Sequence, residues 1–188
     1  MKNLNSIFIL TLISFFFMSC SDDDDANPTP VNEEEVITTV IATLTTATGT
    51  PITMEFRDLD GDGPDTPVIT VSSTLQANTI YSGSLDLLNE TVDPAESITE
   101  EVEEEADEHQ FFFSSSNGLI TTEYGDADAN GNPIGLLFTL TTTTVGDDAI
   151  TITLRHEPNK DAEGVSNGDD TNAGGETDVE VTFPVTIE

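Results

Sequence analysis

The sequence predicts an all-β protein, an antiparallel β-sandwich of the immunoglobulin-like or a related type, with about eight or nine strands and one short acidic helix. Three observations lead to this prediction. Short runs rich in Val, Ile, Thr and Phe alternate apolar with polar residues, which is the period of a half-buried strand. Turn residues, mainly Gly, Asn, Asp and Pro, separate these runs at short intervals. Only one stretch has the spacing of an amphipathic helix.

The expected strands follow the alternating runs along the chain. Asn117-Gly118 predicts a tight hairpin between two of them, because both central positions of such a turn favour positive φ. Pro184 cannot donate to a strand ladder, so the last strand is expected at a sheet edge or with a local bulge. The predicted strands are 36–47, 52–57, 68–73, 79–89, 110–116, 119–124, 136–141, 150–155 and 179–187.

The single helix is predicted over 94–108. Asp93 is expected as the N-cap, with Pro94 at the first helical position and Glu96 at the third. Ile98, Val102 and Ala106 would then form a narrow apolar stripe. The remaining side chains are mostly acidic, which favours a solvated face over a face that recruits cations or docks a partner.

The N-terminal residues predict where the protein is located in the cell. A basic start and a short apolar run describe a secretory signal over residues 1–19, too short to span a bilayer. Cys20 stands at the expected cleavage point, as in the lipobox of bacterial lipoproteins, although an ordinary signal peptide with a chance cysteine is the alternative. We expect residues 20–35 to form a lipidated, disordered tether and 36–188 to form a single β-sandwich domain. The acidic run after Cys20 resembles a surface-export signal and consists of Ser21, Asp22, Asp23, Asp24 and Asp25.

Charge excludes one class of partner. The whole chain has a formal charge of −33, and beyond the signal only Arg57, Arg155 and Lys160 are basic. Nucleic acid is bound mainly through Lys and Arg, so we expect no nucleic-acid binding and membrane contact through the lipid alone. Cys20 is the only cysteine, so no intramolecular disulfide can form.

Two acidic loops are candidate calcium sites, because each matches the first half of a calcium-binding loop. The first has Asp58, Asp60 and Asp62, with Asp65 close enough to help, and the second has Asp126, Asp128 and Asn130. Neither loop has the bidentate Glu that completes an EF-hand. The alternative is that both are ordinary turns between strands.

The two histidines, His109 and His156, do not by themselves predict a site. A metal site shared by them would also require a carboxylate, and their separation in the chain says nothing about their distance in space. The sequence has no nucleophile elbow, phosphate loop or C-x-x-C motif. We therefore expect no enzymatic activity.

The signal, the acidic run after Cys20 and two further stretches carry a resemblance to small Bacteroidota surface lipoproteins of unknown role. These stretches are Glu104 to Gln110 and Arg155 to Lys160. The group is sometimes labelled type 1 periplasmic-binding-fold proteins, a fold of two α/β lobes, whereas the residues of this chain predict one helix. The resemblance implies an outer-membrane location, facing the cell exterior or, alternatively, the periplasm. It implies no functional residue.

Two functions follow from these expectations. The first is a non-catalytic, lipid-anchored surface protein whose β-sandwich binds a partner, with calcium as a possible cofactor. The second is a small-ligand or nutrient-binding lipoprotein that serves an outer-membrane transporter. A pocket lined by Phe111, Phe113, Tyr81 or Tyr124 would favour the second.

Overall fold

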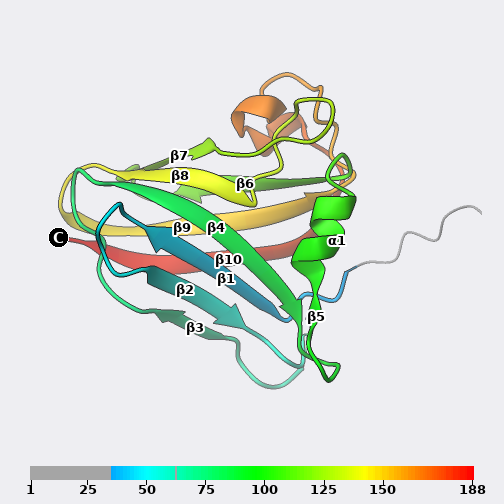
Figure 1. The fold of residues 1–188 in the computed structure, drawn as a ribbon, viewed down its shortest axis with the longest axis horizontal. Helices are drawn as coiled ribbons and strands as arrows, with labels where there is room; N and C mark the ends of the chain where they lie inside the picture. The colour runs from blue at the N-terminus through cyan, green and yellow to red at the C-terminus, as the bar shows by residue number, and fades with distance from the viewer. Residues whose placement is uncertain (1–34, 62) are drawn as a thin grey trace, which may run out of the picture. The chain divides into compact units, whose positions relative to one another are not determined.

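The computed structural model describes residues 35–61 and 63–188, and in them the chain forms a sandwich of two antiparallel sheets. The larger sheet has the order β3-β2-β1-β4-β8-β7, and the short β5 pairs with β4. The smaller sheet has the order β10-β9-β6. Figure 1 shows the two layers, with α1 at the end of the sandwich where the chain enters β1. The predicted all-β sandwich is confirmed.

The larger sheet is built from alternating sequences. Its strands are β1 (Thr39–Thr45), β2 (Ile52–Arg57), β3 (Val68–Val71), β4 (Ile80–Asn89), β5 (Glu96–Ser97), β7 (Ile120–Tyr124) and β8 (Leu137–Thr142). Alternate side chains face inward, as the period of two predicts. Val40, Met54, Leu87 and Phe138 illustrate this, each at most 3% exposed.

The smaller sheet contains the longest strands. Its members are β6 (His109–Ser115), β9 (Gly146–His156) and β10 (Glu176–Ile187). Its inner face, with Phe111, Ile152 and Phe183, packs into the same core as the larger sheet. Pro184 lies in β10, an edge strand of this sheet, as its missing N–H predicts. The loop 157–175 contains two short 3₁₀ turns, η1 (Val165–Asn167) and η2 (Asp170–Asn172).

The helix α1 (Ile98–Glu104) starts four residues later than predicted. The residues expected in its first turn take another partner, because Glu96 and Ser97 pair with Asn89 and Leu88 of β4. Ser97 occupies the N-cap position instead of Asp93. Ile98 and Val102 of the predicted apolar stripe are buried, but α1 ends at Glu104, four residues earlier than predicted, and Ala106 lies beyond it, partly buried against the core.

The predicted Asn117-Gly118 hairpin is wrong in its pairing. The turn is present, but it carries the chain from β6 in one sheet to β7 in the other, and these strands do not pair. Asp148 is the physical reason. Its carboxylate accepts hydrogen bonds from the hydroxyl groups of Ser115 and Ser116 and from the amides of Asn117 and Leu119, so the turn is held against the start of β9.

Candidate metal centre

Two histidines meet at one end of the smaller sheet. His109 is the first residue of β6 and His156 is the last residue of β9, and the antiparallel register places them directly opposite each other. Their rings lie 4.5 Å apart between centroids, tilted by 30°. Both side chains point to the inner face, and the residues are 0% and 3% exposed. The ends of two strands therefore create a buried imidazole pair.

A β-bulge brings Asp178 to the same point. In the pairing of β10 with β9, Thr177 lies opposite Arg155 and Val179 opposite Leu154, so Asp178 is the extra residue. Without the bulge the alternation would point this side chain outward, since Val179 and Val181 face the core. A bulge re-aims one side chain without disturbing the strand beyond it. The Asp178 side chain is 2% exposed.

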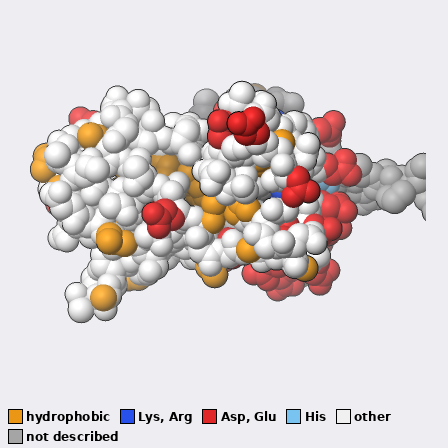
Figure 2. All heavy atoms as spheres, turned by 90° about the horizontal axis from the view of Figure 1, so that it is seen from above, with side chains coloured by type: hydrophobic (Ala, Val, Ile, Leu, Met, Phe, Trp, Pro, Cys, Tyr) orange, Lys and Arg blue, Asp and Glu red, His pale blue; other side chains and the backbone are white. Residues whose placement is uncertain are grey.

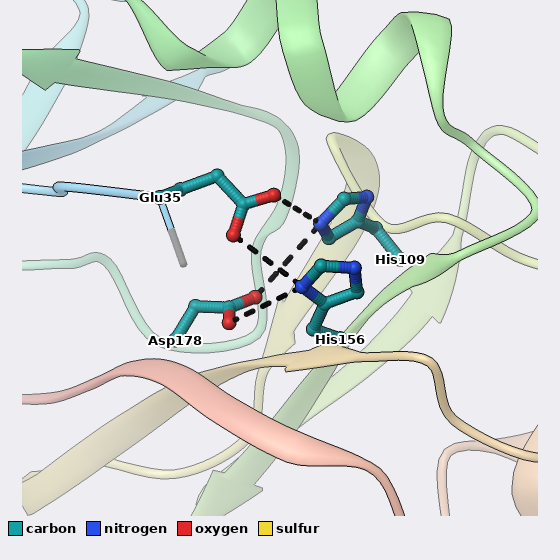
Figure 3. Close-up of side chains that lie close together, drawn as sticks. All are labelled: Glu35, His109, His156 and Asp178. Carbon is teal, nitrogen blue, oxygen red and sulfur yellow. Dashed lines mark hydrogen bonds and ion pairs between the residues drawn. The ribbon is translucent and has the colours of Figure 1, made fainter. Parts of the chain in front are cut away.

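Glu35 supplies a second carboxylate from the segment before β1. Its side chain is 5% exposed, although the sequence assigned residue 35 to the end of the tether. Glu35 Oε1 lies 3.0 Å from His109 Nε2, and Oε2 lies 3.5 Å from His156 Nδ1. Asp178 completes the group, with Oδ2 3.9 Å from His109 Nε2 and Oδ1 3.8 Å from His156 Nδ1. Figure 3 shows all four side chains converging on one point.

The tautomer of His109 follows from its other contact. Nδ1 lies 3.1 Å from the carbonyl oxygen of Glu105, which can only accept, so Nδ1 carries a proton. In a neutral ring Nε2 then presents a lone pair to the carboxylates. A second hydrogen bond that fixes the tautomer in this way is typical of metal-ligating histidines. A cation between Nε2 and Glu35, either a proton or a metal ion, would remove the repulsion between lone pairs.

The contacts of His156 favour a metal ion over a proton as the cation between these side chains. Neither of its ring nitrogens has a hydrogen-bond partner among the described residues, and the same holds for Glu35 Oε2. The distances of 3.5 and 3.8 Å from Nδ1 to the two carboxylates are too long for good hydrogen bonds. Four ligands held tetrahedrally at about 2.0–2.2 Å from a Zn²⁺ ion are about 3.4 Å apart. The shortest carboxylate–imidazole separations, 3.0 to 3.9 Å, involve both oxygens of each carboxylate. With one ligand atom taken from each of the four residues, all four atoms lie within 4.8 Å of one another.

The donor set indicates the class of metal. Two imidazoles and two carboxylates suit a divalent transition-metal ion, and Zn²⁺ takes such ligands in a tetrahedral site. Ca²⁺ prefers six to eight oxygen ligands and Mg²⁺ an octahedron of oxygens, so neither fits two imidazoles. The residues present therefore fit zinc or a neighbouring metal of the first transition row.

The surroundings of the four residues are strongly acidic. Glu108 Oε2 lies 3.8 Å from His156 Nε2, and its side chain is half exposed. Burial, and then the negative charges of Glu96 and Glu35, raise the pKa of Glu101 on the neighbouring helix. This concentration of negative charge attracts cations to the end of the sandwich.

The first predicted calcium loop is exposed and internally bonded. Asp58 Oδ1 accepts from the amides of Asp60 and Gly61, and Asp60 Oδ2 accepts from the amide of Asp65. Asp62 lies outside the described residues. These are the bonds of a turn, and they leave calcium binding here as a prediction.

The second predicted calcium loop already holds a cation from the chain. Asp126 accepts from the amides of Gly135 and Leu137, and Asp128 Oδ1 from those of Asn130 and Asn132. Asp128 Oδ2 lies 3.2 Å from the ammonium group of Lys160. Hydrogen bonds from Asn132, Lys160 and Asn130 hold the pKa of Asp128 below its usual range, although burial alone would raise it.

Cys20 and the acidic run Ser21 to Asp25 lie outside the described residues. No helix in the described part of the chain is long and apolar enough to cross a membrane. Comparison with known protein families, with curated proteins and with solved structures gave no match for this chain.

Proposed function

We propose that this protein is a lipid-anchored module of the outer-membrane surface, non-catalytic, whose β-sandwich binds one divalent transition-metal ion, preferably Zn²⁺. The ligands are His109 Nε2, His156 Nδ1 and one carboxylate oxygen each from Glu35 and Asp178. The observation that carries the metal proposal is the buried imidazole of His156, which faces two carboxylates at metal-ligand spacing and has no hydrogen-bond partner among the described residues.

The number of protein ligands supports a structural role for the ion. Catalytic zinc sites keep one position open for water or substrate, whereas structural sites are filled by four protein ligands. Here four side chains from four separate segments converge. An ion at this point would tie the entry of β1, in the larger sheet, to all three strands of the smaller sheet. This supports a binding or interaction module more than an enzyme.

Metal analysis of the detergent-solubilised full-length protein tests the proposal. We expect close to one equivalent of Zn²⁺ after dialysis against trace zinc. Chelation should lower the melting temperature, because an ion bound only to the folded state stabilises it by about 2.7 kcal/mol at 100 times its Kd. Substitution with Co²⁺ should give the intense visible absorption of a four-coordinate site.

His156→Gln and Asp178→Asn should each abolish both the zinc content and the effect of the chelator. Glu180→Gln is the matched control, since it removes an acid two residues further along β10 on the outer face, where the Glu180 carboxylate accepts a hydrogen bond from the Thr153 hydroxyl. Far-UV circular dichroism checks that each variant is folded. The proposal would be contradicted by a folded wild-type protein that holds no transition metal and whose melting temperature changes with neither zinc nor chelator.

The proposed location at the outer-membrane surface is tested by a separate experiment. Cys20→Ala should release the protein from membranes in cell fractionation. Replacing Asp22 to Asp25 with Ala should keep the protein on the membrane and remove its labelling on intact cells. Unchanged sedimentation in the first case, or equal labelling in the second, would reject the lipid anchor or the export signal respectively.

A further inference from the structure

A groove that shares no lining residue with the metal centre opens between β6 and β7. Its volume is about 450 Å³, and the η1 turn closes one side. Phe113, Ile120, Tyr124 and Ile150 line its apolar part, and the rest is lined mainly by Ser, Thr and Asn, with Glu123 among them. Figure 2 looks onto this side of the molecule and shows hydrophobic side chains at the bottom of a hollow.

The two strands that border the groove are both sheet edges. β7 ends the larger sheet and β6 ends the smaller one, and within residues 35–61 and 63–188 each pairs with a strand on one side only. Such edges carry unpaired backbone groups that can template another strand. Because Asp148 holds the connecting turn against β9, β6 and β7 do not close on each other. The sandwich is therefore open along this line.

The direction of the backbone groups on β7 follows from its neighbours. The carbonyl of Leu119 accepts from the amide of Thr143, and the amide of Gly125 donates to the carbonyl of Leu137, so odd-numbered residues face β8. Backbone groups alternate in direction along a strand. Those of Ile120, Thr122 and Tyr124 consequently point away from β8, toward the groove.

The same reasoning applies to β6. The amide of Ser116 donates to Ala149 and the carbonyl of Glu108 accepts from Glu157, so even-numbered residues face β9. The backbone groups of Phe111, Phe113 and Ser115 face the other way. The amide of Phe111 donates to the carbonyl of Ile134, and the carbonyl of Phe111 accepts from the hydroxyl of Tyr124. These contacts close one end of the groove.

We propose that this groove accepts one extended peptide segment of a partner protein, which adds as a strand to the free edge of β7. Alternate side chains of the peptide would point inward onto Phe113, Ile120 and Ile150, and the others would point to solvent. Main-chain hydrogen bonds supply affinity in such complexes, and the pockets for alternate side chains supply specificity.

Charge selects the kind of peptide. Among the described residues that line the groove, Glu123 alone is charged. Asp126 and Asp170 lie close enough that their charges add to burial in raising the pKa of Tyr124. With −33 over the whole chain, an acidic segment would be repelled. The occupant is therefore a neutral or basic segment with apolar residues at every second position, flanked by Lys or Arg.

Selection of phage-displayed random octapeptides on the full-length protein tests this, and it needs no assumption about the metal. We expect enrichment of alternating apolar sequences with Lys or Arg. Synthetic forms should shift the backbone amide NMR signals of Ile120, Thr122 and Tyr124. A Pro at the centre of the peptide should abolish binding, because it removes a ladder donor.

Thr122→Pro and Thr122→Ala form a matched pair of variants. The amide of Thr122 points to the groove and not to β8, so the Pro variant should fold, as an unchanged melting temperature would show. It should bind the selected peptides about tenfold more weakly, and Thr122→Ala about as well as wild type. Glu123→Lys should weaken basic peptides and admit acidic ones.

Three outcomes would overturn the proposal. One is that no peptide family is enriched. Another is that enriched peptides bind Thr122→Pro as tightly as Thr122→Ala. The third is that NMR shifts at this edge depend on protein concentration alone, which would make a second copy of the chain the occupant.

Discussion

Two buried polar sites of the sandwich differ in where their positive charge comes from. At the first, the ammonium group of Lys160 donates to the carbonyls of Ala106 and Pro133, at 2.5 and 3.1 Å, and to Asp128 at 3.2 Å. Each ammonium hydrogen has an oxygen, and Lys160 is only 5% exposed. At the second, two carboxylates face two imidazoles, and the ion pairs that Glu35 forms among the described residues are with histidines alone.

The difference shows how this acidic chain can bury carboxylates. Burial of a charge is costly unless it is paired and hydrogen-bonded. The Lys160 site meets that requirement with the chain's own atoms. The proposed metal centre would meet it with an ion taken from outside, and its stability would then depend on the supply of metal.

The largest expected effect is at Lys160. Lys160→Met leaves the buried Asp128 carboxylate without its cation, and removing one partner of a buried pair costs about 3–5 kcal/mol. Urea unfolding measures the loss. Adding Asp128→Asn to the same chain should recover part of it.

Added zinc should not restore the stability of the Lys160→Met variant. It should restore the stability of wild-type protein that has been treated with chelator. If zinc rescues both proteins equally, the two sites do not differ in the way described.

Asp148 forms a third buried polar site, and among the described residues its carboxylate is bonded by neutral donors. Burial would raise its pKa, but hydrogen bonds from Ser115, Asn117, Ser116 and Ala149 hold that pKa well below the usual range. The folded pKa is thus depressed below the unfolded value of about 3.9. The stability that Asp148 contributes is present above pH of about 4 and is lost as the pH falls below it.

Asp148→Asn should lower the free energy of unfolding at pH 7 by about 2–3 kcal/mol, because charged hydrogen bonds are weakened and one acceptor is lost. Chemical unfolding at pH 7 and at pH 3 measures the difference from wild type, which should shrink at the lower pH. Neither zinc nor chelator should change the difference. A gap that stays constant between the two pH values would contradict an ionised Asp148.

The smallest expected effect is that of calcium on the acidic loops, of which the first is exposed. Millimolar Ca²⁺ should raise the melting temperature slightly more than Mg²⁺ at matched ionic strength, because extracellular sites bind calcium with a Kd of about 10⁻⁴ to 10⁻³ M. Asp60→Ala should remove much of that difference. Equal shifts with calcium, magnesium and matching sodium would identify the loops as turns that need only screening.

Local rules predicted most of the fold. Alternation in 179–187 and 150–155, for example, identified strands whose inward residues are the buried ones. The rules failed where a distant side chain competed. Glu96 and Ser97 pair with β4 instead of joining the helix. The Asn117-Gly118 turn, whose sequence favours a hairpin, is instead held by Asp148.

The candidate site depended on information that local patterns do not contain. His109 begins one predicted strand and His156 follows the end of another, so an antiparallel pairing of these two strands would have placed them together. That pairing joins β6 to β9, which are neighbours in the sheet but are separated in the sequence by β7 and β8. Several other pairings of the predicted strands were equally compatible with the sequence. The bulge at Asp178 and the inward turn of Glu35 have no local signal, because both depend on how the ends of the two sheets meet.

The position of Glu35 has a mechanical consequence. In a protein held by a lipid at Cys20, tension between the membrane and a captured partner would enter the described domain at this residue, four residues before β1 begins at Thr39. β1 lies between β2 and β4, so pulling it out would shear two hydrogen-bonded ladders at once. A metal ion bound by Glu35 would bear that load first and pass it to the strands of the other sheet. Metal loading would then set the force at which the module comes away from its anchor.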